Sequence, residues 1–486
     1  MSKKNDLEHT STMLGSQNMK SSQRMVSVVE PYELPEGWKW CRLGDFINIF
    51  RGVSYKKNDA HNEKQENDCL IIRGGNIDEG CINLNSDNVF VNKSLVSENQ
   101  IIKKNDVIIV TSTGSIKVIG RAGVSASDYE DVAFGAFLTL ARPNEKANKS
   151  FVNQYFQSSL YRERIRQLAS GVNINNIRIE YITESPFPLP PTLAEQQRIV
   201  NRIESMFAKL DEAKEKAQNV VDGFETRKAA ILHKAFTGEL TAKWRRENGI
   251  EKNKELDFIY NFAQTLSKKD MTNITDFQKQ AYDYVLSDGA VWKKCCIGAI
   301  GVITNGSTPS RKEASFWNGN IPWVSSGEVA NNIIESTNEM ISEEGFNNSS
   351  VKKLPIGTVL IAMIGEGKTR GQTSVLNIEA TTNQNIAAII INHGHVESKF
   401  LWYWLQKEYK NNRTAGNGSG PQALNCQKVR ELPFILPTLP EQVEIVRILD
   451  IIIEKENKAK QAAEAVLGQI DLLKKSILAR AFRGEL

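Results

Sequence analysis

Apolar positions between residues 199 and 224 recur at alternating steps of four and three. They hold Ile199, Ile203, Met206, Leu210, Ala213, Ala217, Val220 and Phe224. This spacing is the heptad pattern of a long helix that packs against another helix. Thr192-x-x-Glu195 follows two prolines and predicts a capping box at the helix start, and Gly238 is placed to end the helix. We therefore expect one long helix over residues 192–240.

The same pattern returns near the end of the chain. Residues 192–240 align without a gap onto residues 438–486 at an offset of 246, and we count 19 identities in 49 positions. The second apolar seam is expected at positions 445, 449, 452, 459, 463, 466, 470, 473 and 477, with Glu456 as an interruption. Small residues in the middle of both seams favour close pairing of the two helices: Ala213, Ala217, Ala459 and Ala463. The alternative is that each helix packs only onto its own domain.

The stretch before each long helix also repeats, though more weakly. Trp38-Lys39-x-Cys41 echoes Trp292-Lys293-x-Cys295, and the apolar run at 106–110 resembles the one at 358–362. Short β-branched runs between Gly, Asn and Ser predict strands, while the aromatic segments 151–168 and 399–409 predict helices. The chain thus reads as one unit of domain and helix used twice. A flexible tail is expected over residues 1–33 and a helical connector over 241–290.

Composition narrows the class of protein. A chain of 486 residues with 40% hydrophobic and 24% charged residues is expected to form two or more globular domains. Six cysteines without a Cys-x-x-Cys motif predict neither a disulfide framework nor a zinc site. Without a long apolar run we expect no contact with a membrane and a cytoplasmic location. A net charge of +4 is a weak nucleic-acid signal, so any basic surface has to come from folding.

Sequence motifs for catalysis are nearly absent. Residues 365–369, Gly-Glu-Gly-Lys-Thr, resemble the end of a nucleotide-binding loop, but the first glycine is replaced by Ala362 and no helix is predicted to follow. A glycine-rich turn explains this run better. Phe134-Gly-Ala-Phe137 has too few glycines for a cofactor fingerprint, no Asp-Pro-Pro-Tyr-like tetrapeptide follows, and His393-Gly-His395 predicts a solvated turn. We expect a chain with no catalytic, cofactor-binding or metal-binding residues.

Loops that mix polar and basic side chains occur in both halves. Asn and Gln can pair with adenine, Arg and Lys with guanine, and Ser, Thr or Lys with phosphate. The first domain offers Arg51, Lys56, Lys57, Thr111, Ser112, Thr113, Lys117, Arg121, Asn173, Asn175, Asn176 and Arg178. The second offers Arg311, Lys312, Lys368, Thr369, Arg370, Asn383, Gln384 and Gln422. We expect Arg51, Lys56 and Lys117 on phosphates and Asn173, Asn175 or Asn176 on base edges; the alternative is ordinary solvated loops.

The repeated helix motifs carry a resemblance to a known family. The segments PLPPTLAEQQRIVNRIESMF, KAAILHKAFTGELTAKWR, LPTLPEQVEIVRIL and KKSILARAFRGEL strongly resemble the specificity subunits of Type I restriction–modification systems. The likeness covers roughly residues 34–486. It implies an α+β fold in which two α/β target-recognition domains are separated by two long helices, conserved in the family, that form an antiparallel coiled coil with a pseudo-two-fold internal repeat. The domains would span 34–191 and 291–437, and the long helices 192–240 and 438–486.

The resemblance also implies a function and partners. A specificity subunit reads a bipartite, asymmetric sequence in double-stranded DNA. It docks two methyltransferase subunits and two restriction subunits, which carry the S-adenosylmethionine, ATP and Mg²⁺ sites, and is not itself catalytic. Two other classes stay open on the residues alone. One is a coiled-coil scaffold that binds only protein, and the other is a self-contained DNA methyltransferase.

Overall fold

The computed structural model describes residues 30–85, 88–169, 176–248, 282–365, 367–391, 394–414 and 423–486. The chain divides into two compact units. Unit 1 contains Met1–Lys216 with Val466–Leu486, and unit 2 contains Ala217–Ala465. Most of the expected tail, most of the expected connector, and the predicted site residues Asn173, Asn175 and Gln422 lie outside the described residues.

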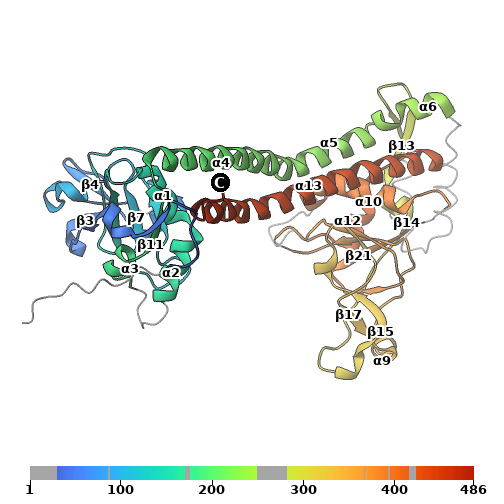
Figure 1. The fold of residues 1–486 in the computed structure, drawn as a ribbon. Helices are drawn as coiled ribbons and strands as arrows, with labels where there is room; N and C mark the ends of the chain where they lie inside the picture. The colour runs from blue at the N-terminus through green and yellow to red at the C-terminus, as the bar shows by residue number, and fades with distance from the viewer. Residues whose placement is uncertain are drawn as a thin grey trace, which may run out of the picture. The chain divides into compact units, whose positions relative to one another are not determined.

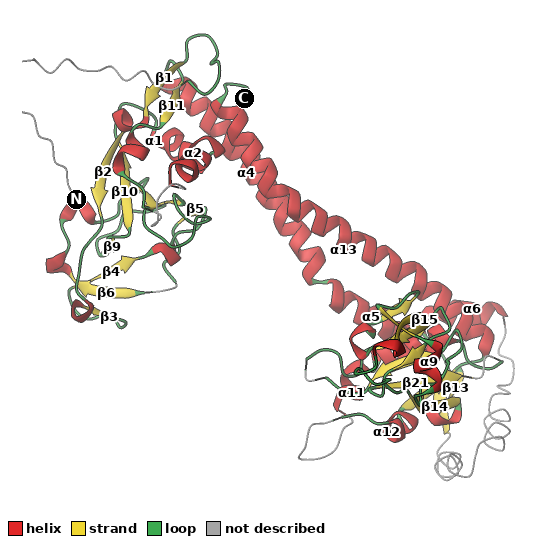
Figure 2. Cartoon of the chain, turned by 90° about the horizontal axis from the view of Figure 1, so that it is seen from below, coloured by secondary structure: helices red, strands yellow, loops and turns green. Residues whose placement is uncertain are grey.

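Unit 1 is built on two sheets and a strand pair (Figures 1 and 2). The larger sheet has the order β2 (Ile47–Arg51), β10 (Leu138–Pro143), β7 (Val107–Val110), β8 (Ala122–Val124) and β5 (Gly80–Cys81). The second sheet has the order β3 (Ala60–His61), β6 (Val89–Asn92), β4 (Asp68–Ile72) and β9 (Val132–Phe134), and β1 (Lys39–Arg42) pairs with β11 (Pro186–Leu189). Three short helices follow the larger sheet: α1 (Lys149–Gln157), α2 (Ser159–Ala169) and α3 (Ile179–Thr183).

Unit 2 repeats this plan. Its larger sheet has the order β14 (Gly301–Asn305), β21 (Ile386–Ile391), β18 (Val359–Ala362), β19 (Thr373–Leu376) and β16 (Asn332–Ile334). A three-stranded sheet has the order β17 (Glu339–Ile341), β15 (Trp317–Val324) and β20 (Thr381–Thr382), and another has β12 (Tyr282–Val285), β13 (Val291–Cys296) and β22 (Pro433–Leu436). The helices are α9 (Glu343–Asn347), α10 (Ser398–Lys407), α11 (Tyr409–Thr414) and α12 (Cys426–Glu431).

The strand order and the pairing directions agree between the units. In both larger sheets the first four strands pair antiparallel and the last pair is parallel: β5 with β8, and β16 with β19. In both smaller sheets one neighbour is antiparallel and the other parallel, with β9 beside β4 and β20 beside β15. The sequence predicted the repeat from its helices. The structure extends it to the whole of each domain.

The first long helix is interrupted, which corrects the expectation of a single helix. It consists of α4 (Leu193–Asp222) and α5 (Phe224–Phe236), followed by α6 (Ala242–Asn248), whereas the second copy, α13, runs without a break over Leu439–Phe482. At Gly223 the Arg227 guanidinium folds back to donate to the Val220 carbonyl at 2.9 Å. A Cβ at Gly223 would lie 2.4 Å from the guanidinium, so a larger residue there would displace the Arg227 side chain from this position.

The two long helices are paired and antiparallel (Figure 1). In unit 1 the start of α4 packs on the end of α13, where Ile199 and Ile203 share a core with Leu478 and Phe482. In unit 2 the end of α5 packs on the start of α13. Gly238 and Gly484 have left-handed φ values of 80° and 74° just after the helix ends, as their positions predicted. The seam expected for the first copy is buried or half-buried at every position from 199 to 224.

The seam expected for the second copy is partly wrong. Ala459, Val466 and Leu473 are exposed, and the next residue in the chain (460, 467 or 474) takes the place of each on the contact line. The predicted positions 445, 449, 452, 456, 463, 470 and 477 are buried or half-buried. The polar residues on this line have partners. Glu456 accepts from Arg227 at 2.7 Å, Lys460 lies over the Phe224 ring, and Lys474 pairs with Asp211. Side-chain pairing between the helices therefore overrides the purely apolar pattern.

The recurring Glu-Gln pair at each helix start has a structural role. Gln196 accepts from the backbone N–H of Asn148, which precedes α1, at 2.8 Å. Gln442 accepts from the backbone N–H of Glu397, which precedes α10, at 2.9 Å. Both glutamines also donate to a proline carbonyl of the preceding strand segment. The glutamine thus ties each long helix to the first helix of its own domain.

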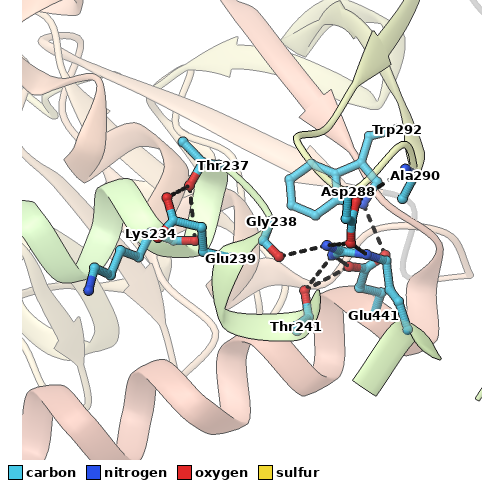
Figure 3. Close-up of polar contacts among 10 residues, drawn as sticks. Lys234, Thr237, Gly238, Glu239, Thr241, Asp288, Ala290, Trp292 and Glu441 are labelled. Atoms are coloured by element: carbon cyan, nitrogen blue, oxygen red, sulfur yellow. Dashed lines mark hydrogen bonds and ion pairs between the residues drawn. The ribbon is translucent and has the colours of Figure 1, made fainter. Parts of the chain in front are cut away.

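The neighbouring glutamates have different environments. Thr192 accepts from the Glu195 N–H at 3.1 Å, as the capping box predicts, but the Glu195 carboxylate pairs with Arg198 at the surface. In unit 2 the Glu441 carboxylate is buried (Figure 3) and accepts from Arg245, Thr241 and Trp292. In a capping box the glutamate side chain would accept from the backbone N–H of the threonine at the helix start. In both copies the glutamate carboxylate instead accepts from an arginine.

The ends of the described segments are also held by side chains. Tyr32, within the stretch expected to be a flexible tail, donates to the Phe482 carbonyl at 2.8 Å and meets Trp40 edge-on. The expected connector begins with α6 and includes β12 close to its end.

Among the residues that the structure describes, no helix has the length and apolar character needed to cross a membrane.

Candidate nucleic-acid interface

Four segments of unit 1 meet beyond the strands of its larger sheet, where β2 and β7 end and β10 begins. We call them loop cluster 1: residues 51–57, 111–117, 135–137 and 176–178. They meet because β2 and β7 are antiparallel to β10, so the ends of β2 and β7 lie beside the start of β10. The backbone N–H groups of Thr111 and Ser112 both donate to the Phe137 carbonyl at 3.1 Å. The Ile177 N–H donates to the Thr111 carbonyl at 2.8 Å.

Unit 2 builds the equivalent loop cluster 2 from residues 305–312, 363–365 with 367–370, 383–385 and 423–425. The Met363 N–H donates to the Asn385 carbonyl at 2.9 Å, and the Leu424 N–H donates to the Met363 carbonyl at 3.0 Å. These bonds match those of Thr111, Phe137 and Ile177 one for one. The two clusters therefore share a backbone scaffold.

A glycine allows the first segment of each cluster to approach the turn before β10 or β21. A Cβ at Gly52 would lie 2.1 Å from the Gly135 carbonyl oxygen, and one at Gly306 would lie 1.8 Å from the Thr382 carbonyl oxygen. Neither position could hold a larger residue without moving the backbone. These glycines fix the distance between the first segment and the turn.

Each cluster presents one lysine at the same place in its second segment. Lys117 is exposed, and its carbonyl accepts from Arg162 and Arg166 of α2, both at 3.3 Å. Lys368 is exposed, and its carbonyl accepts from the Tyr409 hydroxyl of α11 at 2.7 Å. A helix behind the loop thus holds the backbone of both lysines while their side chains face solvent.

The support for Lys117 is strongly basic. Arg162 is buried and also donates to the Ile119 carbonyl at 2.8 Å. Burial, followed by the charge of Arg166, lowers the pKa of the Arg162 guanidinium. Arg121 lies close enough to contribute to this shift and donates to the Gly74 carbonyl at 3.1 Å. Several positive charges therefore converge behind the second segment of loop cluster 1, which favours an anionic ligand.

The structure places most of the described candidate residues at the surface of the two clusters. Arg51, at the end of β2, and Lys56, Lys57, Asn176 and Arg178 are exposed, and Ser112 forms a β-bridge with Asn176. Ser112, Thr113, Arg121, Thr369 and Arg370 are partly exposed, and Lys312 and Gln384 are exposed.

Three further candidates, besides Arg121, have side chains whose contacts within the protein are extensive. Thr111 is buried, and its hydroxyl bonds the Phe137 carbonyl and the Thr139 hydroxyl. Asn383 is buried, and its side-chain oxygen accepts from the Asn385 N–H at 3.0 Å, so it shapes the turn. Arg311 pairs with Glu339 through both carboxylate oxygens and stacks 3.6 Å from the Trp317 ring centre.

Phe137 is a surface residue that the sequence did not single out as a candidate. Its side chain is 70% exposed, although the flanking Phe134 and Leu138 are buried. The only signal in the sequence is an aromatic residue directly after a Gly-Ala turn. That signal does not distinguish an exposed ring from a core ring.

Two motifs that the sequence analysis set aside, the possible nucleotide-binding loop and the possible metal site, can be compared with the structure. The glycine-rich run at 365–369 leads into strand β19, not a helix, so it lacks the helix N-terminus that a phosphate-binding loop uses. Within the described ranges no group of three or more His, Cys, Asp or Glu side chains is arranged to hold a metal ion.

Comparison with known proteins defines the class. The model of the Type I restriction modification DNA specificity domain matches residues 35–221 and 290–466, so each match covers one globular domain and part of a long helix. The chain belongs to this family. The two matches correspond to the two copies of the repeat, each with its domain and most of its long helix.

Particular relatives match nearly the whole chain. The EcoKI specificity subunit of Escherichia coli K12 is 28% identical over 466 residues, which cover 93% of this chain and 90% of the relative. The StySPI specificity subunit of Salmonella potsdam is 26% identical over 465 residues, again 93% and 90%. The solved HsdS subunit from Thermoanaerobacter tengcongensis has the same fold at a TM-score of 0.57 and 19% identity, covering 94% of this chain and 99% of that one.

Proposed function

We propose that this chain is the DNA-reading subunit of a Type I restriction–modification complex and that it reads a bipartite, asymmetric target. The observation that carries the proposal is the pair of loop clusters, which share their backbone hydrogen bonds but differ in their side chains. A shared scaffold suits one mode of docking on the duplex. Different side chains suit different bases, so the two half-sites differ.

In this proposal the exposed basic residues contact phosphates. Lys117 and Lys368 are the strongest candidates because both occupy the same supported position. Removing one phosphate-binding side chain should reduce the slope of log affinity against log salt by about 0.9. Asn176 and Gln384, both exposed on the clusters, are the described amides best placed to reach base edges, where each good contact contributes about 1–3 kcal/mol of discrimination. The Gln384 oxygen accepts from the Thr308 hydroxyl at 2.5 Å, so this residue would offer its NH₂ group to a base. Asn173, Asn175 and Gln422 remain predictions of the sequence.

The chemistry is assigned to partners. We propose that two methyltransferase subunits and two restriction subunits dock on the chain and supply the S-adenosylmethionine, ATP and Mg²⁺ sites. The sequence supports this through the incomplete nucleotide-loop motif at Ala362 and the missing methyltransferase tetrapeptide. Saturable binding of S-adenosylmethionine to the purified chain by calorimetry would instead support a self-contained methyltransferase.

The test has two parts. Methylated adenines are mapped in genomic DNA from cells that express the chain with its methyltransferase partner, and we expect one split motif with unlike halves. Gel-shift titration of the complex with a duplex of that motif and with a scrambled duplex then measures specificity. A complex that binds neither duplex would refute DNA reading and favour a protein-only scaffold.

A further inference from the structure

The turn of loop cluster 1 carries an unusual side chain. Phe137 is the one aromatic residue among the large hydrophobic side chains that are exposed in the described residues. It is in the turn between β9 and β10, beside Ser112 and Asn176. Loop cluster 1 has a second exposed apolar side chain, Ile116, which is 42% exposed. Apolar groups gathered on a surface of polar and basic loops indicate a binding site for a ligand with apolar faces.

The backbone that carries Phe137 is rigid. Its carbonyl accepts three hydrogen bonds, from the N–H groups of Thr111 and Ser112 and from the Thr111 hydroxyl at 3.2 Å. On either side of it the chain is pinned, since the Leu138 N–H donates to the Gly135 carbonyl at 2.9 Å and the Val53 N–H donates to the Phe134 carbonyl at 2.7 Å. These bonds fix the main chain at Phe137, so the point from which the ring projects is constant.

The surroundings favour DNA as the ligand. Arg51 is exposed at the end of β2 and is paired with Thr139, two residues from Phe137. Lys117 is exposed in the second segment, backed by the buried Arg162. Basic groups that surround an apolar ring match phosphates that surround the stacked faces of bases, and exposed Phe side chains act as wedges between base steps in other DNA-binding proteins.

The structure thus leads us to infer that Phe137 inserts between two bases of the half-site read by unit 1 and unstacks them. This inference rests on the proposed function. Unit 2 has Asn385 at the same position, with its carbonyl held by the Met363 N–H. An amide can bond to a base but does not wedge a step open. Insertion from this turn is therefore confined to one half-site, which makes the distortion at the turn as asymmetric as the target sequence.

The experiment uses the full chain with its methyltransferase partner and duplexes of the mapped motif with 2-aminopurine at single positions of either half. The methylated adenines are left unlabelled, because a methyltransferase flips its target base out of the stack by itself. The fluorescence of this base analogue rises when it is unstacked. With wild type we expect a rise at one step of one half-site. Phe137→Ala should abolish it and weaken binding to the motif about tenfold to hundredfold, with a smaller effect on scrambled DNA. Phe137→Leu, which keeps an apolar wedge, should retain most of both signals.

The controls separate the possible failures. Asn385→Ala should leave the fluorescence rise unchanged. Because the ring is exposed, Phe137→Ala should melt at the wild-type temperature. A wild-type complex that binds no duplex refutes the proposed function itself. If wild type binds but the fluorescence rise is absent, appears in both halves or survives in Phe137→Ala, the inference is overturned. It is also overturned if the alanine variant no longer binds its methyltransferase partner, because the ring would then be a protein contact.

Discussion

The buried carboxylate at the start of α13 offers a sharp test of how this chain is held together. Glu441 and Arg245 have side chains only 5% and 4% exposed, and Glu441 also accepts from Thr241 at 2.7 Å and from Trp292 at 3.0 Å (Figure 3). Arg245 has a second carboxylate partner in Asp288 at 2.6 Å. The perturbation is Glu441→Gln, which keeps the size of the side chain and removes its charge.

The magnitude follows from burial. Removing one partner of a buried ion pair typically costs about 3–5 kcal/mol because the remaining charge stays desolvated. Asp288 is 30% exposed and still compensates part of the Arg245 charge, so we expect the lower end, about 3 kcal/mol. For a unit of this size that corresponds to a fall in Tm of about 6–12 °C.

The repeat supplies the matched control. Glu195 occupies the same position in the first copy, but it is 30% exposed and its partner Arg198 is 54% exposed. A surface pair of this kind contributes about 0–1 kcal/mol, so Glu195→Gln should lower Tm by at most about 4 °C.

Differential scanning calorimetry of both variants measures the shifts, and hydrogen exchange of the first turns of α13 shows where the structure loosens. Equal shifts for Glu441→Gln and Glu195→Gln would refute the argument from burial. A normal melting temperature for Glu441→Gln would show that hydrogen bonding alone, which glutamine can provide, holds the network together.

Three further changes test the site and the core. Gly52→Ala should cost about 1–3 kcal/mol in chemical denaturation because its Cβ would press on the facing turn, whereas Gly114→Ala, with open space around its Cβ, should be close to neutral. Lys117→Ala should weaken binding to the motif and to scrambled DNA alike and reduce the salt slope by about 0.9; an unchanged slope would remove it from the phosphate contacts. In thiol titration of the native chain Cys81, the exposed cysteine, should react fast, while burial raises the pKa of Cys296 to about 12 and should keep it unreactive at neutral pH; rapid labelling of Cys296, located by peptide mapping, would contradict this.

Sequence alone predicted the two paired long helices and the repeat, but not the interruption of the first helix. Heptad spacing, the prolines before each helix and the glycines after them are local signals, because they act through the backbone within one or two turns. They predicted the start of α4, the ends at Gly238 and Gly484, and strands such as β7 and β18. The segments at the start and end of each long helix carried the resemblance to the family.

Tertiary structure decided what depends on neighbours distant in the chain. The contact line of α13 passes through Lys460 and Lys474 because these side chains have partners on the first helix, Phe224 and Asp211. The first helix is interrupted at Gly223, where the Arg227 guanidinium folds back onto the backbone. Glu195 and Glu441 are alike in sequence, but only Glu441 meets a buried arginine. The loop clusters exist because antiparallel strands bring residues 51, 111 and 137 to one edge of a sheet. Whether Phe137 is a core residue or a surface residue depends on that arrangement, since its hydrophobicity is the same in both cases.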